Sequence, residues 1–168
     1  MERKFEGIRN SVADVDKGWV RIFFKTVGGT SVKNNLFQFT ISTKKHQEFI
    51  DITNLINEAL EKSSVDSGIL VVYCPHTTSG ITINENADPD VVRDILSSLN
   101  KTFPVKGDYS HYEGNSHAHL KSSYMGTNKT LIINEGRPIL GTWQSVYFCE
   151  FDGPRNRKVF IKIIEDIN

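Results

Sequence analysis

Alternation of apolar and polar residues predicts strands along most of the chain. Residues 18–27 and 35–42 alternate on either side of a Gly-Gly pair, which predicts a hairpin because glycine enters tight turns at low steric cost. The continuous apolar run at residues 69–74 predicts a strand that is buried on both faces. Further segments rich in β-branched, aromatic and aliphatic residues are expected to be strands: residues 129–134, 139–151 and 158–164. We therefore expect about eight strands, mostly antiparallel because turn signals separate them.

Helical spacing of apolar residues predicts two main helices. Thr53 is a candidate N-cap for the first helix, and Asp88 is one for the second, with Pro89 at the first helical position. The second helix is expected to end around Asn100. Two helices packed on a mostly antiparallel sheet system define an α+β fold. The length of the chain fits one domain over residues 1–168.

The charge balance, the amino terminus and the cysteines limit which partners, compartment and cysteine chemistry are expected. Twenty basic and twenty acidic residues give a formal net charge of zero, so neither a nucleic-acid partner nor a membrane partner is expected. The amino terminus lacks the apolar segment of a signal peptide or a membrane span, which favours the cytoplasm. Cys74 and Cys149 lie in apolar or aromatic runs, which favours buried reduced thiols over a disulfide.

A histidine-rich stretch at residues 108–121 holds three of the five histidines. Read as a strand, it would present His117, His119 and Lys121 on one face, and the preceding loop is long enough for His111 to supply a third ligand. Imidazoles are common ligands for divalent metals, and three protein ligands with an open position define a catalytic metal site. The alternative is an exposed polar face of an edge strand. A lysine beside such a site suits a phosphate better than a metal ion.

A second group of polar side chains follows the apolar run at residues 69–74. His76 and three hydroxyl residues enter a loop there, namely Thr77, Thr78 and Ser79. Loops fixed at strand ends commonly carry binding groups. The alternative for His76 is an ordinary loop histidine with a hydrogen-bonded ring.

Several charged residues are candidates to complete the site. Glu85, Glu113 and Glu150 are candidates for a proton acceptor or a carboxylate that orients a ligand, although most carboxylates in any chain are simply solvated. Arg155 follows a predicted turn, where its guanidinium either clamps an anion or keeps the turn soluble. Spacing alone does not choose among these candidates.

Taken together, these motifs resemble those of the YjbQ-like family, which is also labelled secondary thiamine-phosphate synthase. The segments that carry the resemblance are 75–80, 84–90, 111–121, 140–144 and 150–155. The resemblance covers the chain from about Phe39 onward, so residues 1–33 look like an extension to a core at residues 34–168. It implies a compact α+β subunit, usually a homotrimer, with a polar pocket near subunit boundaries that sometimes holds a metal.

The resemblance also implies an activity on a phosphorylated small molecule. The labelled reaction joins a pyrimidine diphosphate to a thiazole phosphate with loss of pyrophosphate, and its cofactor would be a divalent metal, zinc or magnesium. The alternatives are a metal-dependent hydrolase of a phosphorylated compound and a protein that binds a metal or an anion without turnover. The predicted roles are catalysis for His76, Glu85 and Glu113, substrate binding for Thr77, Thr78, Ser79, Asn115, Lys121 and Arg155, and metal binding for His111, His117 and His119.

Overall fold

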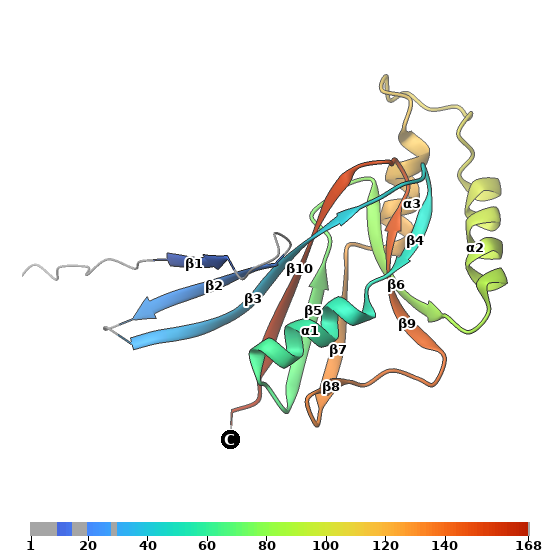
Figure 1. Cartoon of the computed structure of the whole chain (residues 1–168). Coiled ribbons are helices and arrows are strands. Elements are labelled where there is room, and N and C mark those ends of the chain that lie inside the picture. The colour runs from blue at the N-terminus through green and yellow to red at the C-terminus, as the bar shows by residue number, and fades with distance from the viewer. Residues whose placement is uncertain (1–9, 15–19, 28–29, 168) are drawn as a thin grey trace, which may run out of the picture.

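Two antiparallel sheets form the framework of the protein (Figure 1). The computed structural model describes residues 10–14, 20–27 and 30–167. The larger sheet has seven strands in the order β1-β2-β3-β10-β5-β7-β8, and the smaller has the order β4-β9-β6. The strands are β1 (Asn10–Asp14), β2 (Val20–Val27), β3 (Thr30–Ser42), β4 (Glu48–Asp51), β5 (Gly68–Tyr73), β6 (Ser79–Glu85), β7 (Asn128–Asn134), β8 (Arg137–Pro138), β9 (Gln144–Glu150) and β10 (Asn156–Glu165). The predicted α+β class with mostly antiparallel strands is confirmed.

Three helices accompany these strands within the described residues: α1 (Thr53–Ser63), α2 (Pro89–Thr102) and α3 (Ser116–Met125). The start of α2 is as predicted, because the Asp88 side chain accepts the N–H of Asp90 at 2.8 Å. Thr53, in contrast, is the first residue of α1 and not its cap. Its hydroxyl oxygen instead accepts the N–H of Val146 at 3.0 Å. None of these helices is long and apolar enough to span a membrane.

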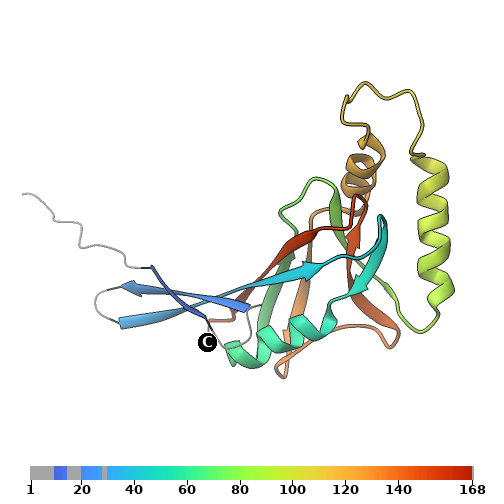
Figure 2. The same ribbon diagram turned by 45° about the horizontal axis from the view of Figure 1, so that its top comes forward.

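The main core lies between the two sheets. Phe37 and Phe39 of β3 and Ile161 of β10 are fully buried there, and the register pairs Phe37 with Ile161. Alternation explains this arrangement, since every second residue of these strands points inward. Helix α1 lies next to the smaller sheet and packs on the same core against strands of the larger sheet. Helices α2 and α3 pack on the other face of the smaller sheet. Figure 2 shows α2 as the outermost element on that side.

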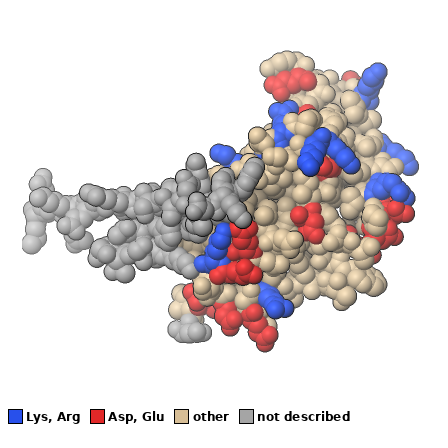
Figure 3. All heavy atoms as spheres, viewed as in Figure 1, with Lys and Arg blue, Asp and Glu red and all other residues tan. Residues whose placement is uncertain are grey.

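The outer face of the larger sheet carries exposed apolar side chains. The prediction that residues 69–74 are buried on both faces is wrong, because Ile69 and Tyr73 of β5 are exposed. Ile69 pairs with Ile132 and Ile164 on the neighbouring strands, and both are also exposed. Nothing among the described residues covers this row. Elsewhere the surface is mixed, and Figure 3 shows Lys and Arg interspersed with Asp and Glu.

The histidine-rich stretch does not form a strand, so that prediction is wrong. Residues 116–125 form α3, and the residues before them form a loop. The predicted hairpin of β2 and β3 is present, although its turn at residues 28–29 lies outside the described residues. These differences place the functional side chains quite differently from the sequence-based expectation.

Candidate functional site

Helix α3 is held tightly against the first residues of β6. The hydroxyl of Ser122 donates to the carbonyl oxygen of Ser79 at 2.7 Å, and the N–H of Ile81 donates to the carbonyl of Gly126 at 2.9 Å. Gly80 permits this approach, since a Cβ there would lie 2.8 Å from the Gly126 carbonyl oxygen. The helix is therefore fixed in position, and so are the side chains on its inner face.

Because this stretch forms a helix, His117 is buried on one face, whereas His119 lies on another side together with His111. His117 and Lys121 are four residues apart and share the buried face of α3, where they are 2% and 0% exposed. His119 lies on a different side and packs edge-on against His111, with ring centroids 5.3 Å apart. His111 in turn lies 3.6 Å from the carboxylate of Glu113. The prediction that His117, His119 and Lys121 share one face is therefore wrong, because it assumed a strand and these residues form a helix.

A three-histidine metal centre does not fit this arrangement within one chain. Among residues 10–14, 20–27 and 30–167, no group of three or more His, Cys, Asp or Glu side chains is placed to hold a metal ion. The closest cation to His117 on α3 is the ammonium of Lys121, which would repel a divalent ion in this buried setting.

Lys121 is a buried cation whose partners are neutral. Its Nζ donates to Gln47 Oε1 at 3.0 Å and to Asn100 Oδ1 at 2.5 Å. No carboxylate in the described part of the chain forms a salt bridge with it. Burial lowers the pKa of Lys121 below its usual range. An ammonium has three N–H donors, so one remains for another acceptor.

His46, which the sequence did not single out, completes this cluster. It lies in the exposed turn between β3 and β4, and its Nε2 is 3.4 Å from Nε2 of His117. The other nitrogen of the His117 ring, Nδ1, is buried without a partner among the described residues. Burial lowers the pKa of His117, nearby Lys121 and His46 lower it further, and Asp152 opposes them. His117 is therefore held as a neutral imidazole.

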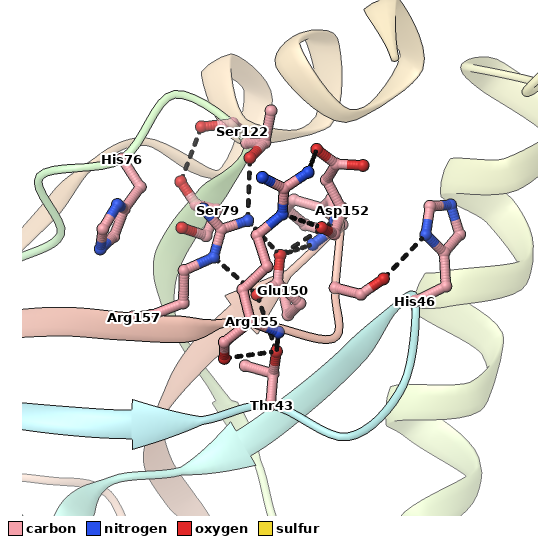
Figure 4. Close-up of polar contacts among 12 residues, drawn as sticks. Thr43, His46, His76, Ser79, Ser122, Glu150, Asp152, Arg155 and Arg157 are labelled. Atoms are coloured by element: carbon pink, nitrogen blue, oxygen red, sulfur yellow. Dashed lines mark hydrogen bonds and ion pairs between the residues drawn. The ribbon is translucent and has the colours of Figure 1, made fainter. Parts of the chain in front are cut away.

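The amino-terminal end of α3 adds further unpaired groups. The side-chain amide of Asn115 donates to Asp152 at 3.2 Å, while its Oδ1 is buried without a partner within the described chain. Arg155 pairs with the same carboxylate at 2.6 Å (Figure 4). The backbone N–H groups of Ser116 and His117 bond to no described acceptor, as expected for the first turn of a helix. We call His46, Asn115, His117, Lys121, Asp152 and Arg155 the α3 site.

A buried ion pair lies next to this site. Arg157 forms two hydrogen bonds to the Glu150 carboxylate, at 2.7 and 2.5 Å, and also donates to Thr78 at 2.9 Å. Burial alone would raise the pKa of Glu150, but the hydrogen bonds from Arg157 and from the backbone of Asp152 outweigh it and lower the pKa. Glu150 is thus an ionised structural group that orients the turn after β9.

The predicted loop of His76, Thr77, Thr78 and Ser79 is largely engaged in supporting contacts. The His76 ring accepts the N–H of Lys158 at 2.8 Å, and Ser79 lies 3.2 Å from the Cys74 sulfur. Thr77 is exposed. Figure 4 shows the His76 ring on the far side of Arg157 from His46. Within one chain, this loop borders the Glu150 pair rather than facing His117.

Glu85 lies at the opposite end of β6 from Ser79. Seven residues of strand separate the two ends by roughly 20 Å. Glu85 instead borders a separate groove, together with the exposed Trp143 and Gln144. The structure therefore gathers Asn115, His117, Lys121 and Arg155 from the predicted set, and it leaves the remaining candidates elsewhere.

The fold and the α3 site define an α+β protein with a buried, uncompensated cation beside a histidine pair. The family model described as UPF0047 protein YjbQ-like matches residues 37–166. A UPF0047 protein of Methanocaldococcus jannaschii is 53% identical over 131 residues, which span 78% of this chain and 95% of that protein. YugU of Bacillus subtilis is 50% identical over 125 residues, spanning 74% and 95% of the two chains. The chain belongs to the YjbQ-like UPF0047 family.

Solved structures agree with this assignment. A YjbQ/UPF0047 family protein from Clostridium acetobutylicum aligns with a TM-score of 0.75 at 61% identity, covering 76% of this chain and 98% of that one. A YbjQ-like protein of unknown function from Sulfolobus solfataricus gives a TM-score of 0.75 at 29% identity, covering 78% and 96%. The family architecture therefore covers the part of the chain that carries the α3 site.

Proposed function

We propose that this protein is an enzyme that acts on a phosphorylated small molecule bound at the α3 site. The observation that carries the proposal is the ammonium of Lys121, which is fully buried and has only amide oxygens as described partners. A buried charge without a counter-charge is costly, and a bound anion would compensate it. Its partner Asn100 is exposed and its partner Gln47 is half-buried, so the ammonium lies close to the surface.

The amino-terminal turn of α3, on the same helix as Lys121, also favours an anion. Its free N–H groups at Ser116 and His117 and the positive end of the helix dipole both favour a phosphate. Lys121 adds a full positive charge one turn further along the helix. The proposal assigns no metal to the α3 site, since an ion there would lie beside this ammonium.

Turnover, as opposed to simple binding, is supported by the unpaired Nδ1 of His117. A neutral buried imidazole with a free nitrogen is suited to accept a proton at neutral pH. The finer reaction that we propose is the one implied by the family resemblance, in which pyrimidine diphosphate joins thiazole phosphate and pyrophosphate leaves. In that reaction Lys121 would balance the charge of the leaving group.

An assay of the purified chain tests this reaction. Pyrimidine diphosphate and thiazole phosphate are supplied, and the coupled product and pyrophosphate are measured for the wild type, His117→Gln and the control His119→Gln. We expect product from the wild type and the control, and none above the enzyme-free level from His117→Gln. Equal product from all three proteins would contradict the role of His117. Absence of product from the wild type would reject this reaction, while phosphate binding tests the anion site separately.

We also propose that the chain assembles as a homotrimer. The exposed row of Ile69, Ile132 and Ile164 on the outer face of the larger sheet supports an association surface. Light scattering after gel filtration should give three times the mass of one chain. Ile132→Lys should lower that mass, because a charge would be buried at the interface. A monomeric wild type would contradict the proposal.

A further inference from the structure

We infer that His46 is a positioning residue that fixes the tautomer of His117 and receives the proton that His117 takes from the bound ligand. This inference rests on the proposed function, because it assigns the proton path of the same α3 site. His46 has no role in the predicted set of site residues. The role proposed for His46 follows from the hydrogen-bonding geometry around the His46 and His117 rings.

The backbone at Gly153 determines the tautomer of His46. The carbonyl oxygen of Gly153 lies 3.4 Å from His46 Nδ1 (Figure 4). A carbonyl oxygen only accepts hydrogen bonds, so the proton of the neutral His46 ring is on Nδ1 and the lone pair is on Nε2. His117 Nε2 lies 3.4 Å from that lone pair and must therefore carry a proton. Both contacts are long for neutral groups, and hydrogen bonds shorten when charge develops.

The same assignment leaves a lone pair on Nδ1 of His117. This atom is buried and has no partner among the described residues, although buried polar atoms are rarely left unpaired. It belongs to the first turn of α3, where the N–H groups of Ser116 and His117 are also free. A ligand O–H or N–H group is the natural partner of this nitrogen, since the ligand phosphate would occupy the adjacent N–H groups.

The surrounding charges oppose a second positive charge on His117. Lys121 and His119 lie on the same helix, and Asp152 is the acidic group that faces the ring. Arg155 already pairs with Asp152, which weakens the stabilisation that this carboxylate can give. The ring of His46, in contrast, is exposed to solvent, where an imidazolium is well hydrated. A positive charge on His46 is therefore hydrated, whereas a positive charge on His117 would be buried beside Lys121.

The transfer conserves protons and charge. As the ligand O–H or N–H bond breaks, Nδ1 of His117 takes its proton, and the proton on Nε2 of His117 passes to Nε2 of His46. His117 remains neutral throughout, and the positive charge appears on His46, whose Nδ1–H is held by the carbonyl of Gly153. Solvent then removes the proton from the exposed ring.

The tautomers can be measured without any substrate. Long-range ¹H–¹⁵N correlation spectra of the full chain, recorded at about pH 8 where ordinary imidazoles are neutral, distinguish the two tautomers of each histidine. His46→Gln and His117→Gln provide the assignments. We expect the Nδ1–H form for His46 and the Nε2–H form for His117. An Nδ1–H form of His117 would overturn the inference.

Proton release on binding provides the second measurement. Inorganic phosphate is titrated calorimetrically in two buffers with different ionisation enthalpies, into the wild type, His46→Gln and the control His119→Gln. We expect proton release to the buffer in the wild type and the control, because the proton that leaves the ligand reaches solvent through His46, and we expect its loss in His46→Gln with phosphate still bound. Unchanged proton release in His46→Gln would overturn the inference. If phosphate fails to bind the wild type, the proposed anion site is wrong, while the tautomer measurement still decides the role of His46.

Discussion

Glu150 and Arg157 form a buried bidentate ion pair that joins the end of β9 to the start of β10 (Figure 4). Glu150 is 0% exposed and also accepts the N–H groups of Phe151 and Asp152, at 3.1 and 2.9 Å. All of its oxygens are thus engaged, which is the condition under which a buried carboxylate is tolerated. The pair determines the course of the turn that presents Asp152 to the α3 site.

Breaking this pair should destabilise the protein strongly. In Glu150→Gln, the Arg157 charge stays buried without a carboxylate, so the free energy of unfolding should fall by about 3–5 kcal/mol. Arg155→Met removes a half-exposed ion pair and should cost at most about 1 kcal/mol. Urea denaturation followed by circular dichroism measures both changes. Equal effects of the two substitutions would contradict the role given to the buried pair.

The Glu150 pair should also shape the acid stability of the protein. The pKa of Glu150 is lowered on folding below the reference value of 4.5. Its stabilisation is therefore complete above the unfolded-state pKa and is lost as the pH falls through the folded-state pKa. Unfolding free energies measured between about pH 7 and about pH 3 should fall more steeply in the wild type than in Glu150→Gln. Parallel curves for the two proteins would contradict this prediction.

Gly80→Ala should displace α3 from the smaller sheet. The added Cβ would lie 2.8 Å from the Gly126 carbonyl oxygen and 3.0 Å from the Met125 Cβ, so the helix must shift. We expect a loss of about 1–3 kcal/mol in unfolding free energy and an altered NMR signal of the His117 ring. Gly141→Ala is the matched control, because its new Cβ meets only the flexible side chain of Gln144. A His117 signal identical to that of the wild type would contradict the prediction.

Both cysteines should be unreactive in the folded protein. Burial raises the pKa of the Cys74 and Cys149 thiols, and only the thiolate reacts readily. A coloured disulfide reagent such as dithionitrobenzoate should therefore label neither thiol at neutral pH and should label both in denaturant. Rapid labelling of either cysteine in the native protein would show that its thiol is accessible.

Most of the strands and α2 were predictable from the sequence because their signals are local. Alternation fixes which residues of β3 face the core, and the Asp88–Pro89 pair marks the start of α2. Helix α3 was not predictable in this way, since its buried face is formed by His117, Ala118, Lys121 and Ser122. A mainly polar buried face produces no apolar stripe, and hydropathy therefore gives no sign of the helix.

The candidate site was predictable only in part for a related reason. Asn115, His117 and Lys121 stand out because they belong to one dense polar stretch. His46 carries no local signal, since it meets His117 across 71 residues of sequence. Asn100 likewise reaches Lys121 from another helix. Such pairs are set by the packing of α3 between β6 and α2, and a single sequence does not reveal that packing.

The central claim is that Lys121 recognises an anion, and calorimetric titration of inorganic phosphate into the full chain tests it most directly. The variants are Lys121→Met and the control Lys129→Met, whose ammonium bonds the carbonyl oxygens of Met125 and Asn128. Circular dichroism verifies that each variant is folded. We predict that Lys121→Met weakens phosphate binding at least about tenfold, or ~1.4 kcal/mol, while Lys129→Met binds like the wild type. Phosphate binding by a folded Lys121→Met with wild-type affinity would contradict the account.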